Sequence, residues 1–408
     1  MRKRMMGLMA VAFLVLWMQP SPGFSAEPIK MVCLETISGT MKFVGDAYAY
    51  GIKFAVEEIN AAGGLMGRPI EMIYDDHQMK PDVAIRKAKK HILEDKVKFI
   101  VSGTATNVGA ALADLAGKEK VIMLNYGTTG DHMTAEAFNP YHFRVCMSSA
   151  QHGTSLAAYL SGTKYNTYYI LCQDYSAPRQ GADAFKKAMT RFKPGWKLVG
   201  EDYHPVGAKD LAPYINKIID SKAEILYTIN WGGDLIVLVK QAKALGMKSK
   251  IASWFISDPI VCEAAGDAAV GAITAEIYML TNDTPQNVAF IERWKKRNLT
   301  PEHPYPDLFV GKAYQAFMFM AEAIKKANSI KNEDVIKAWE GLTYTSPMGP
   351  MTMRACDHQV IAQIPVAEIL PGPGAFFKFP YLGKPLTLIP GEKAAVPAEL
   401  VNNPRCKK

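Results

Sequence analysis

Strand-like and helix-like patterns alternate along most of the chain. Short apolar runs typical of buried strands stand at 29–36, 69–76, 97–101, 121–125, 168–172, 196–203, 224–229 and 250–255. Residues Ile52, Val56 and Ile59, for example, share one face of a helix between the first two runs. That helix is predicted at 46–62, and further helices are predicted at 181–191, 210–220, 234–244 and 307–327. Strands that alternate with helices predict a parallel sheet covered by helices on both faces.

The alternation restarts in the middle of the chain, which indicates two lobes. After the stretch FRVCMSSAQHG (143–153), a new series of helices and strands continues to 280. The tail from 346 is rich in proline and glycine, with short strand-like pieces. We therefore expect an α/β protein of two lobes, to one or both of which the late segments return.

The first residues predict an export signal. Arg2, Lys3 and Arg4 precede an apolar segment at 5–18 that is too short to span a bilayer comfortably. Cleavage is expected after Ala26, so 1–26 is the predicted signal peptide. No later segment is apolar enough to span a membrane, and the mature chain is expected to be soluble and exported.

Charge and motifs argue against several functional classes. Without the three basic residues at 2–4, the 47 lysines and arginines fall to 44 against 39 acidic residues, a net charge of +5. This is mild, so nucleic acid is not an expected partner. The chain has no GxGxxG, no Gly-Lys-Ser/Thr ending, no HExxH pair and no GxSxG elbow. We expect no cofactor, metal or catalysis; a hydrolase is the outside alternative, because a fold alone never fixes function.

The cysteines predict no metal site. The six form no CxxC pair, which leaves zinc and thioredoxin-like chemistry unsupported. Cys33 and Cys172 lie in strand-like runs and are expected to be buried thiols. Cys356 and Cys406 are candidates for a disulfide, although the sequence does not fix the pairing.

The stretch SGTATNVGA, from Ser102 to Ala110, directly follows the strand at 97–101. It combines glycine with three hydroxyls and an amide at the start of a predicted helix, where such groups suit a small anion such as a carboxylate. These residues are also ordinary cap and turn residues, so the stretch alone allows both interpretations.

Three stretches carry a resemblance to a known family. They are PIKMVCLETISGTMKFVGDAYAYGIKFAVEEINAAGGLMGRPIEMIYDD (28–76), LVKQAKALGMKSKIASWF (238–255) and AAGDAAVGA (264–272). The chain resembles the periplasmic substrate-binding proteins of branched-chain amino acid ABC transporters over nearly all of its mature length.

The resemblance implies two Rossmann-like lobes joined by three crossing strands, the periplasmic binding protein type I fold, which close on a ligand. It places the first lobe at 27–146 with 279–349 and the second at 147–278 with 350–408. The hinges would lie near 144–148, 276–280 and 347–353. Ligands of open α/β sheets bind beyond the carboxyl ends of strands, and the stretch at 102–107 follows one such end.

In the first lobe, the resemblance implies a cradle for a ligand carboxylate. Two hydroxyl-rich turns at neighbouring strand ends would form it, and Thr106 is the best-matching hydroxyl. The implied contacts are Thr104, Ala105, Thr106, Asn107, Gly127, Thr128 and Thr129.

In the second lobe, the chain departs from the amino-acid binders it resembles. Those proteins pair a glutamate with the ligand ammonium, whereas Trp254 and Phe255 stand in its place here and Asp258 follows in a loop. A buried ammonium without a partner costs roughly 3–5 kcal/mol. Either Asp258 or another acid therefore substitutes, or the ligand carries no ammonium. Together with Trp254, Tyr175 and Trp231 predict a flat apolar wall; packing in the core is the alternative.

These features predict the periplasmic binding component of an ABC importer. It would act as a monomer, capture a small carboxylate with an aromatic or branched aliphatic body by hinge closure, and deliver it to an inner-membrane ABC permease. Two alternatives stay open: uptake of a branched-chain or other apolar amino acid, and a periplasmic sensor of the same fold.

Overall fold

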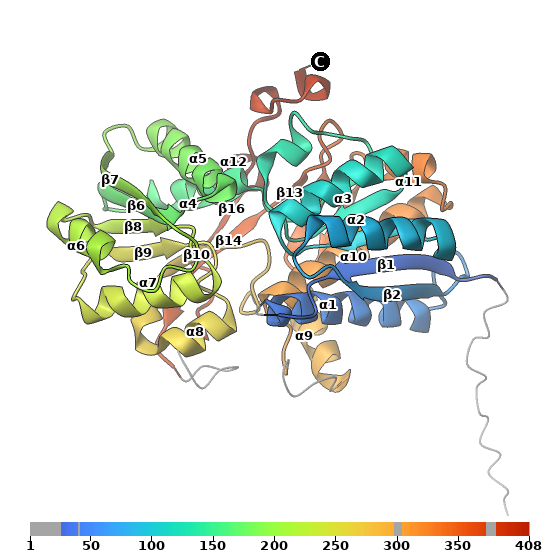
Figure 1. Ribbon diagram of the computed structural model, residues 1–408, viewed down its shortest axis with the longest axis horizontal. Coiled ribbons are helices and arrows are strands. Elements are labelled where there is room, and N and C mark those ends of the chain that lie inside the picture. Colours follow the sequence, from blue (N-terminus) through green and yellow to red (C-terminus); the bar gives the residue numbers. More distant parts are fainter. Residues whose placement is uncertain (1–25, 40, 298–303, 373–380, 408) are drawn as a thin grey trace, which may run out of the picture.

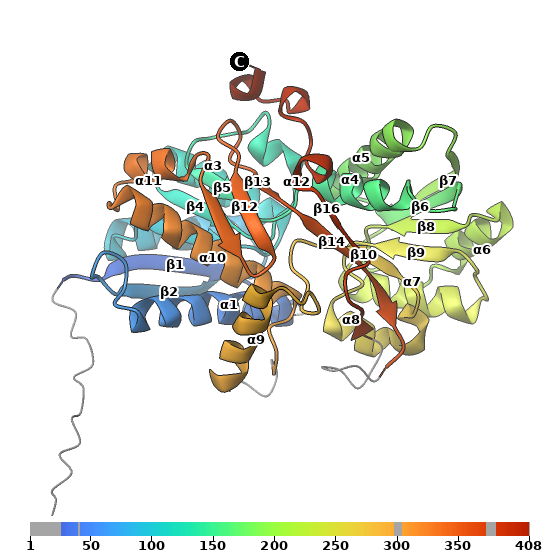
Figure 2. The ribbon, with the colours of Figure 1, turned by 180° about the vertical axis from the view of Figure 1, so that it is seen from behind.

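The computed structural model describes residues 26–39, 41–297, 304–372 and 381–407. Two lobes lie side by side, and connecting segments run between them (Figure 1, Figure 2). Apart from Ala26, the predicted signal peptide lies outside the described residues. Within the described part of the chain, we find no helix that is both long and apolar enough to span a membrane.

The first lobe is built on a parallel sheet with the order β2-β1-β3-β4-β5. Its strands are β1 (Ile29–Glu35), β2 (Ile70–Asp76), β3 (Phe99–Ser102), β4 (Ile122–Asn125) and β5 (His142–Arg144). One face packs on α1 (Lys42–Ala61), α10 (Leu308–Ala327) and α11 (Asn332–Trp339). Helix α9 (Pro285–Arg297) packs on α1 and α10, where the Phe290 ring lies near the rings of Phe54 and Tyr314. The other face packs on α2 (Pro81–Lys90) and α3 (Thr106–Glu119). Because β1, β3 and β4 are buried on both sides, their sequences are nearly continuous apolar runs, whereas the edge strand β2 is partly exposed.

The second lobe is built on a mixed sheet with the order β15-β14-β10-β9-β8-β6-β7, and β16 pairs with β14. Its strands are β6 (Thr167–Gln173), β7 (Lys197–His204), β8 (Ile225–Thr228), β9 (Lys250–Ser253), β10 (Ile273–Ala275), β14 (Ile364–Leu370), β15 (Tyr381–Leu382) and β16 (Thr387–Ile389). Its helices are α4 (Ser149–Leu160), α5 (Ser176–Phe192), α6 (Ala212–Ser221), α7 (Gly232–Ala244), α8 (Pro259–Ala265) and α12 (Gly391–Ala394). The predicted α/β fold is confirmed.

The third crossing between the lobes lies later than the sequence predicted. The first two run from β5 to α4 and from β10 to α9, as expected. In contrast, β12 (Gly349–Met353) pairs with β11 (Thr343–Ser346) and β13 (Val360–Ala362) in a small antiparallel sheet. Since the chain joins the second sheet only at β14, this crossing falls at Gln363 and not near 347–353. The exact lobe boundaries stay a prediction.

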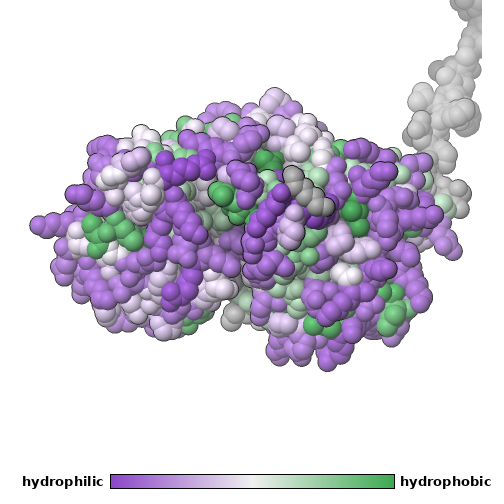
Figure 3. All heavy atoms as spheres, turned by 90° about the horizontal axis from the view of Figure 1, so that it is seen from above, coloured by the Kyte–Doolittle hydropathy of each residue, from purple (hydrophilic) through white to green (hydrophobic). Residues whose placement is uncertain are grey.

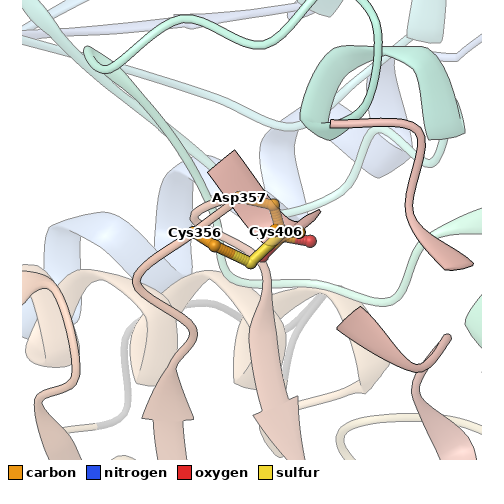
Figure 4. A group of neighbouring side chains, drawn as sticks. All are labelled: Cys356, Asp357 and Cys406. Atoms are coloured by element: carbon orange, nitrogen blue, oxygen red, sulfur yellow. A yellow bond between two sulfur atoms is a disulfide. The ribbon is translucent and has the colours of Figure 1, made fainter. Parts of the chain in front are cut away.

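The tail makes a further connection between the lobes. Helix α12 packs on α4 of the second lobe. Beyond it, a disulfide joins Cys406 to Cys356 in the loop after β12 (Figure 4). Asn403 Nδ2 also donates to the carbonyl oxygens of Thr134 and Cys356, each at 3.2 Å. The candidate pairing of Cys356 with Cys406 is therefore confirmed.

The face seen from above is mainly hydrophilic, with small separate hydrophobic patches, and it is indented between the two lobes (Figure 3). The other cysteines of the described chain lie inside the protein: Cys33, Cys146, Cys172 and Cys262 are buried free thiols. This confirms the expectation for Cys33 and Cys172.

Candidate ligand-binding site

A cavity of about 490 Å³ lies between the lobes, beyond the carboxyl ends of strands from both sheets. Parallel strands bring their carboxyl ends to one edge of a sheet, which is where ligands of such folds bind. Of the ten residues predicted for the site, nine line this cavity: Thr104, Ala105, Thr106, Asn107, Gly127, Thr129, Tyr175, Trp231 and Trp254.

Thr128, predicted as a ligand contact, does not line the cavity, because its side chain in the turn after β4 faces the protein interior. Asn125 Oδ1 accepts hydrogen bonds from the backbone N–H groups of Gly127 at 3.1 Å and Thr128 at 2.9 Å, so these donors are already used. The Thr128 side chain is buried and packs against Gly109, where an added Cβ would lie 2.5 Å from the Thr128 hydroxyl oxygen. Thr128 is a packing residue behind the cavity, whereas Thr129 lines it.

The start of α3 offers hydrogen-bond donors to the cavity. Because the helix begins at Thr106, its first backbone N–H groups have no acceptor within the helix, and the positive end of its dipole lies here. Ala105 holds a φ of 68°, a conformation that side-chain-bearing residues adopt only under constraint. The Thr106 methyl lies against Gly130, and its hydroxyl makes no hydrogen bond with any described residue.

A buried acid that the sequence analysis missed supports this turn from below. Glu35, the last residue of β1, accepts hydrogen bonds from the Gly103 N–H at 2.5 Å, from the Tyr126 hydroxyl at 2.6 Å and from the Thr104 hydroxyl. The Thr104 side chain therefore holds the turn in place. Burial raises the pKa of Glu35 to about 7, although these hydrogen bonds oppose the rise. In the sequence, the feature that could have pointed to Glu35 is its position as an acid at the end of a buried apolar strand.

Two glycines allow tyrosines to pack beneath the strand ends. A Cβ on Gly103 would lie 2.4 Å from the Tyr126 ring, and one on Gly127 would lie 2.3 Å from the Tyr48 hydroxyl oxygen. Tyr48 lines the cavity and is only 3% exposed, and its hydroxyl makes no hydrogen bond with any described residue. It is a second hydroxyl that a ligand can use, and the sequence analysis did not single it out.

Aromatic side chains of the second lobe form the opposite wall. Tyr175 and Trp231 are the residues just before α5 and α7, and Trp231 Nε1 donates to the Tyr175 hydroxyl at 2.9 Å. Trp254 is 1% exposed; it donates from Nε1 to the Tyr227 hydroxyl at 2.8 Å and stacks on His152 at 4.3 Å between ring centroids. The wall is thus fixed by contacts behind it.

The first lobe adds aromatic surface of its own. Phe43 and Tyr48 come from α1 and Phe309 from α10, and all three line the cavity. The rings of Tyr48 and Phe309 meet edge to face, with centroids 5.2 Å apart. A ligand in the cavity therefore touches aromatic rings of both lobes.

One carboxylate lines the second-lobe side. Asp258 directly precedes α8 and accepts a hydrogen bond from the Ile260 N–H at 2.9 Å, so it caps that helix. Burial raises the pKa of Asp258 to about 7, and the neighbouring charge of Asp307 adds to the rise. The acid that the sequence placed in a loop is therefore a helix cap at the cavity.

Comparisons with known proteins agree with this architecture. The family model for periplasmic binding proteins matches residues 28–373. The chain belongs to the periplasmic binding protein family. The Leu/Ile/Val-binding protein homolog 4 of Brucella abortus is 29% identical over 374 residues, 88% of each chain. As the resemblance indicated, this periplasmic binding protein is of the branched-chain amino acid ABC transporter type.

Solved structures show the same fold. A leucine-, isoleucine-, valine-, threonine- and alanine-binding protein from Brucella ovis, in a closed conformation, has a TM-score of 0.84 at 26% identity, covering 91% of this chain and 97% of that one. A solute-binding protein of an ABC transporter from Rhodopseudomonas palustris BisB5, in complex with 3,4-dihydroxybenzoic acid, has a TM-score of 0.79 at 22% identity, covering 89% and 98%. Proteins of this family bind substrates and are not enzymes.

Proposed function

We propose that this periplasmic binding protein captures a small carboxylate with an aromatic or branched aliphatic body for an ABC importer. The observation that carries the proposal is the pairing of two surfaces in one cavity. The donor-rich start of α3 lies on one side, and the aromatic wall with Tyr175 and Trp231 lies on the other. A carboxylate suits the first surface, and a flat or branched apolar body suits the second.

The proposed setting is the periplasm, after removal of 1–26. The protein acts as a monomer and passes its ligand to an inner-membrane ABC permease. Both lobes line the cavity, so a bound ligand bridges them and shifts the population toward the closed form.

The residues at the second-lobe end of the cavity favour an acid without an ammonium group. Trp254 and Phe255, which both line the cavity, are apolar.

An apolar amino acid is the second candidate, and Asp258 is the observation that favours it. This buried carboxylate lines the cavity, so it can receive a ligand ammonium. The relatives named for leucine, isoleucine and valine binding also favour it.

A thermal-shift screen of the refolded, ligand-free mature protein separates the two candidates. The panel pairs leucine with 4-methylvalerate and phenylalanine with 3-phenylpropionate, and it includes benzoate. A ligand that binds only the folded state raises the melting temperature by mass action. Stabilisation by the ammonium-free acids alone supports the proposal, whereas stabilisation by leucine or phenylalanine alone replaces it with the amino-acid candidate. Asp258→Asn should abolish the response to amino acids and leave the response to the acids.

A further inference from the structure

Glu35 occupies an unusual position for an acid. It is 1% exposed, and it lies directly behind Gly103 and Thr104, which line the cavity at the proposed carboxylate site. Its three hydrogen-bond partners are a backbone N–H and two hydroxyls. Among the described residues, no lysine, arginine or histidine forms an ion pair or hydrogen bond with it. When Glu35 is ionised, a buried negative charge therefore lies directly behind Gly103 and Thr104, the residues that separate it from the proposed site of the ligand carboxylate.

We propose that Glu35 is a positioning residue that links carboxylate capture to a proton. Its side chain holds the turn before α3, and its negative charge, when present, repels the ligand carboxylate. The protein therefore binds the anion best when Glu35 carries a proton, and binding draws a proton onto it. This inference rests on the proposed carboxylate ligand and adds pH sensitivity to the same site.

The groups packed around Glu35 do not change charge near neutral pH. Asp76 lies opposite Glu35 on β2; partial burial raises its pKa, but hydrogen bonds from Ser38, Gln78 and Ile37 outweigh this and lower it, so Asp76 stays ionised. Burial lowers the pKa of His77, which follows it, to about 4, so His77 stays neutral. Cys33 comes from β1, Tyr48 from α1 and Tyr126 from the turn after β4. Burial raises the pKa of each well above its ordinary value, so all three stay neutral where Glu35 changes charge. The pKa of Glu35 itself, raised to about 7, places that change in a range where a carboxylate ligand stays ionised.

Two other titratable groups line the same cavity and need their own controls. Asp258 lines it from the position just before α8, with Asp307 nearby, and burial raises its pKa to about 7 as well. His132 faces it from the segment after β4. Asp258→Asn and His132→Asn remove these charges and leave Glu35 in place.

The test measures the affinity for benzoate, 3-phenylpropionate and 4-methylvalerate by calorimetry between pH 6 and pH 8.5. For the wild type we expect binding about five to ten times weaker at pH 8.5 than at pH 6, and uptake of about half a proton per ligand at pH 7.5. Glu35→Gln keeps a hydrogen-bonding side chain under the turn and removes the charge, so its affinity should be independent of pH. Glu35→Ala leaves the turn unsupported and should bind weakly at every pH. The Asn variants at 258 and 132 should keep the wild-type slope.

Three results overturn the inference. A wild type whose affinity is flat across this range, without proton uptake, excludes the linkage and leaves the proposed function intact. A slope that persists in Glu35→Gln, or that disappears in Asp258→Asn or His132→Asn, assigns the proton to another group. If none of the three acids binds at any pH, the proposed carboxylate function fails and this inference fails with it. Proton uptake is measured on the wild type, so its absence overturns the inference even if no variant folds.

Discussion

Replacing Glu35 with glutamine should make the ligand-free protein more stable at alkaline pH. The pKa of Glu35 is raised from its ordinary 4.5 to about 7 by burial, so the folded state binds this proton more tightly than the unfolded chain does. The stabilisation that the folded protein gains from this proton is fully present below pH 4.5 and is lost as the pH rises through about 7. The full loss amounts to about 3 kcal/mol, of which about 2.5 kcal/mol falls between pH 5 and pH 8.

The assay is urea unfolding of wild type and Glu35→Gln at pH 5 and pH 8, followed by circular dichroism. Glutamine does not titrate, so the stability difference between the two proteins should shift in favour of the variant by about 2.5 kcal/mol from pH 5 to pH 8. Asp258→Asn is the matched control, because Asp258 is another buried acid with a pKa raised to about 7. It should remove its own share of the pH dependence and leave that of Glu35. Parallel stability curves for wild type and Glu35→Gln would refute the argument.

Three further substitutions test other parts of the molecule. Thr106→Val removes a hydroxyl at the start of α3 and should weaken carboxylate binding about tenfold or more, measured by calorimetry, with an unchanged melting temperature; equal affinity would exclude the hydroxyl contact. Trp231→Ala should cost about tenfold or more in affinity for 3-phenylpropionate and less for acetate, because it removes a ring from the wall; equal losses for the two acids would contradict the wall. The double variant Cys356→Ser, Cys406→Ser should lower the free energy of unfolding by about 2–4 kcal/mol in urea titrations, since the disulfide closes a loop with a sequence separation of 50. Wild type with its disulfide reduced is the control, and the variant should lose no more stability than this control does. If neither protein loses stability, the disulfide has no stabilising role.

The apolar pattern predicted the alternating elements well because strands buried on both faces leave an unbroken apolar signal. It was less informative about where helices begin. Helix α5 begins at Ser176, five residues before the predicted start, since Pro178 fits the first turn of a helix, where its missing N–H costs nothing. Helix α1 likewise begins at Lys42 and not at 46. The family resemblance placed the third crossing too early, and short strands such as Gly349–Met353 carry too little apolar pattern to correct it.

Side-chain chemistry at strand ends, together with the family resemblance, predicted most of the candidate site. Residues that look like ordinary core were missed. Tyr48 and Phe309 lie on long amphipathic helices, and nothing in their spacing separates a cavity lining from helix packing. Glu35 is the last residue of an apolar strand, and an acid at that position is usually interpreted as the first residue of the following loop. Thr128 was predicted as a ligand contact but does not line the cavity. The sequence of a hydroxyl-rich turn does not show which way its side chains face, and hydrogen bonds to the Asn125 side chain direct this turn away from the cavity.

The pairing of α1 with α10 has a consequence for how the chain folds. Gly51 of α1 lies so close to α10 that an added Cβ would be 2.4 Å from the Val310 carbonyl oxygen. Since α10 begins at Leu308, a chain synthesised from its N-terminus cannot cover the apolar face of α1 until most of its length exists. The strands β6 to β9 of the second lobe pair within a short stretch of sequence and need no such delay. The strands β1 to β5 of the first lobe also pair early, because all of them lie within 29–144, but the apolar face of α1 is expected to be covered late in folding.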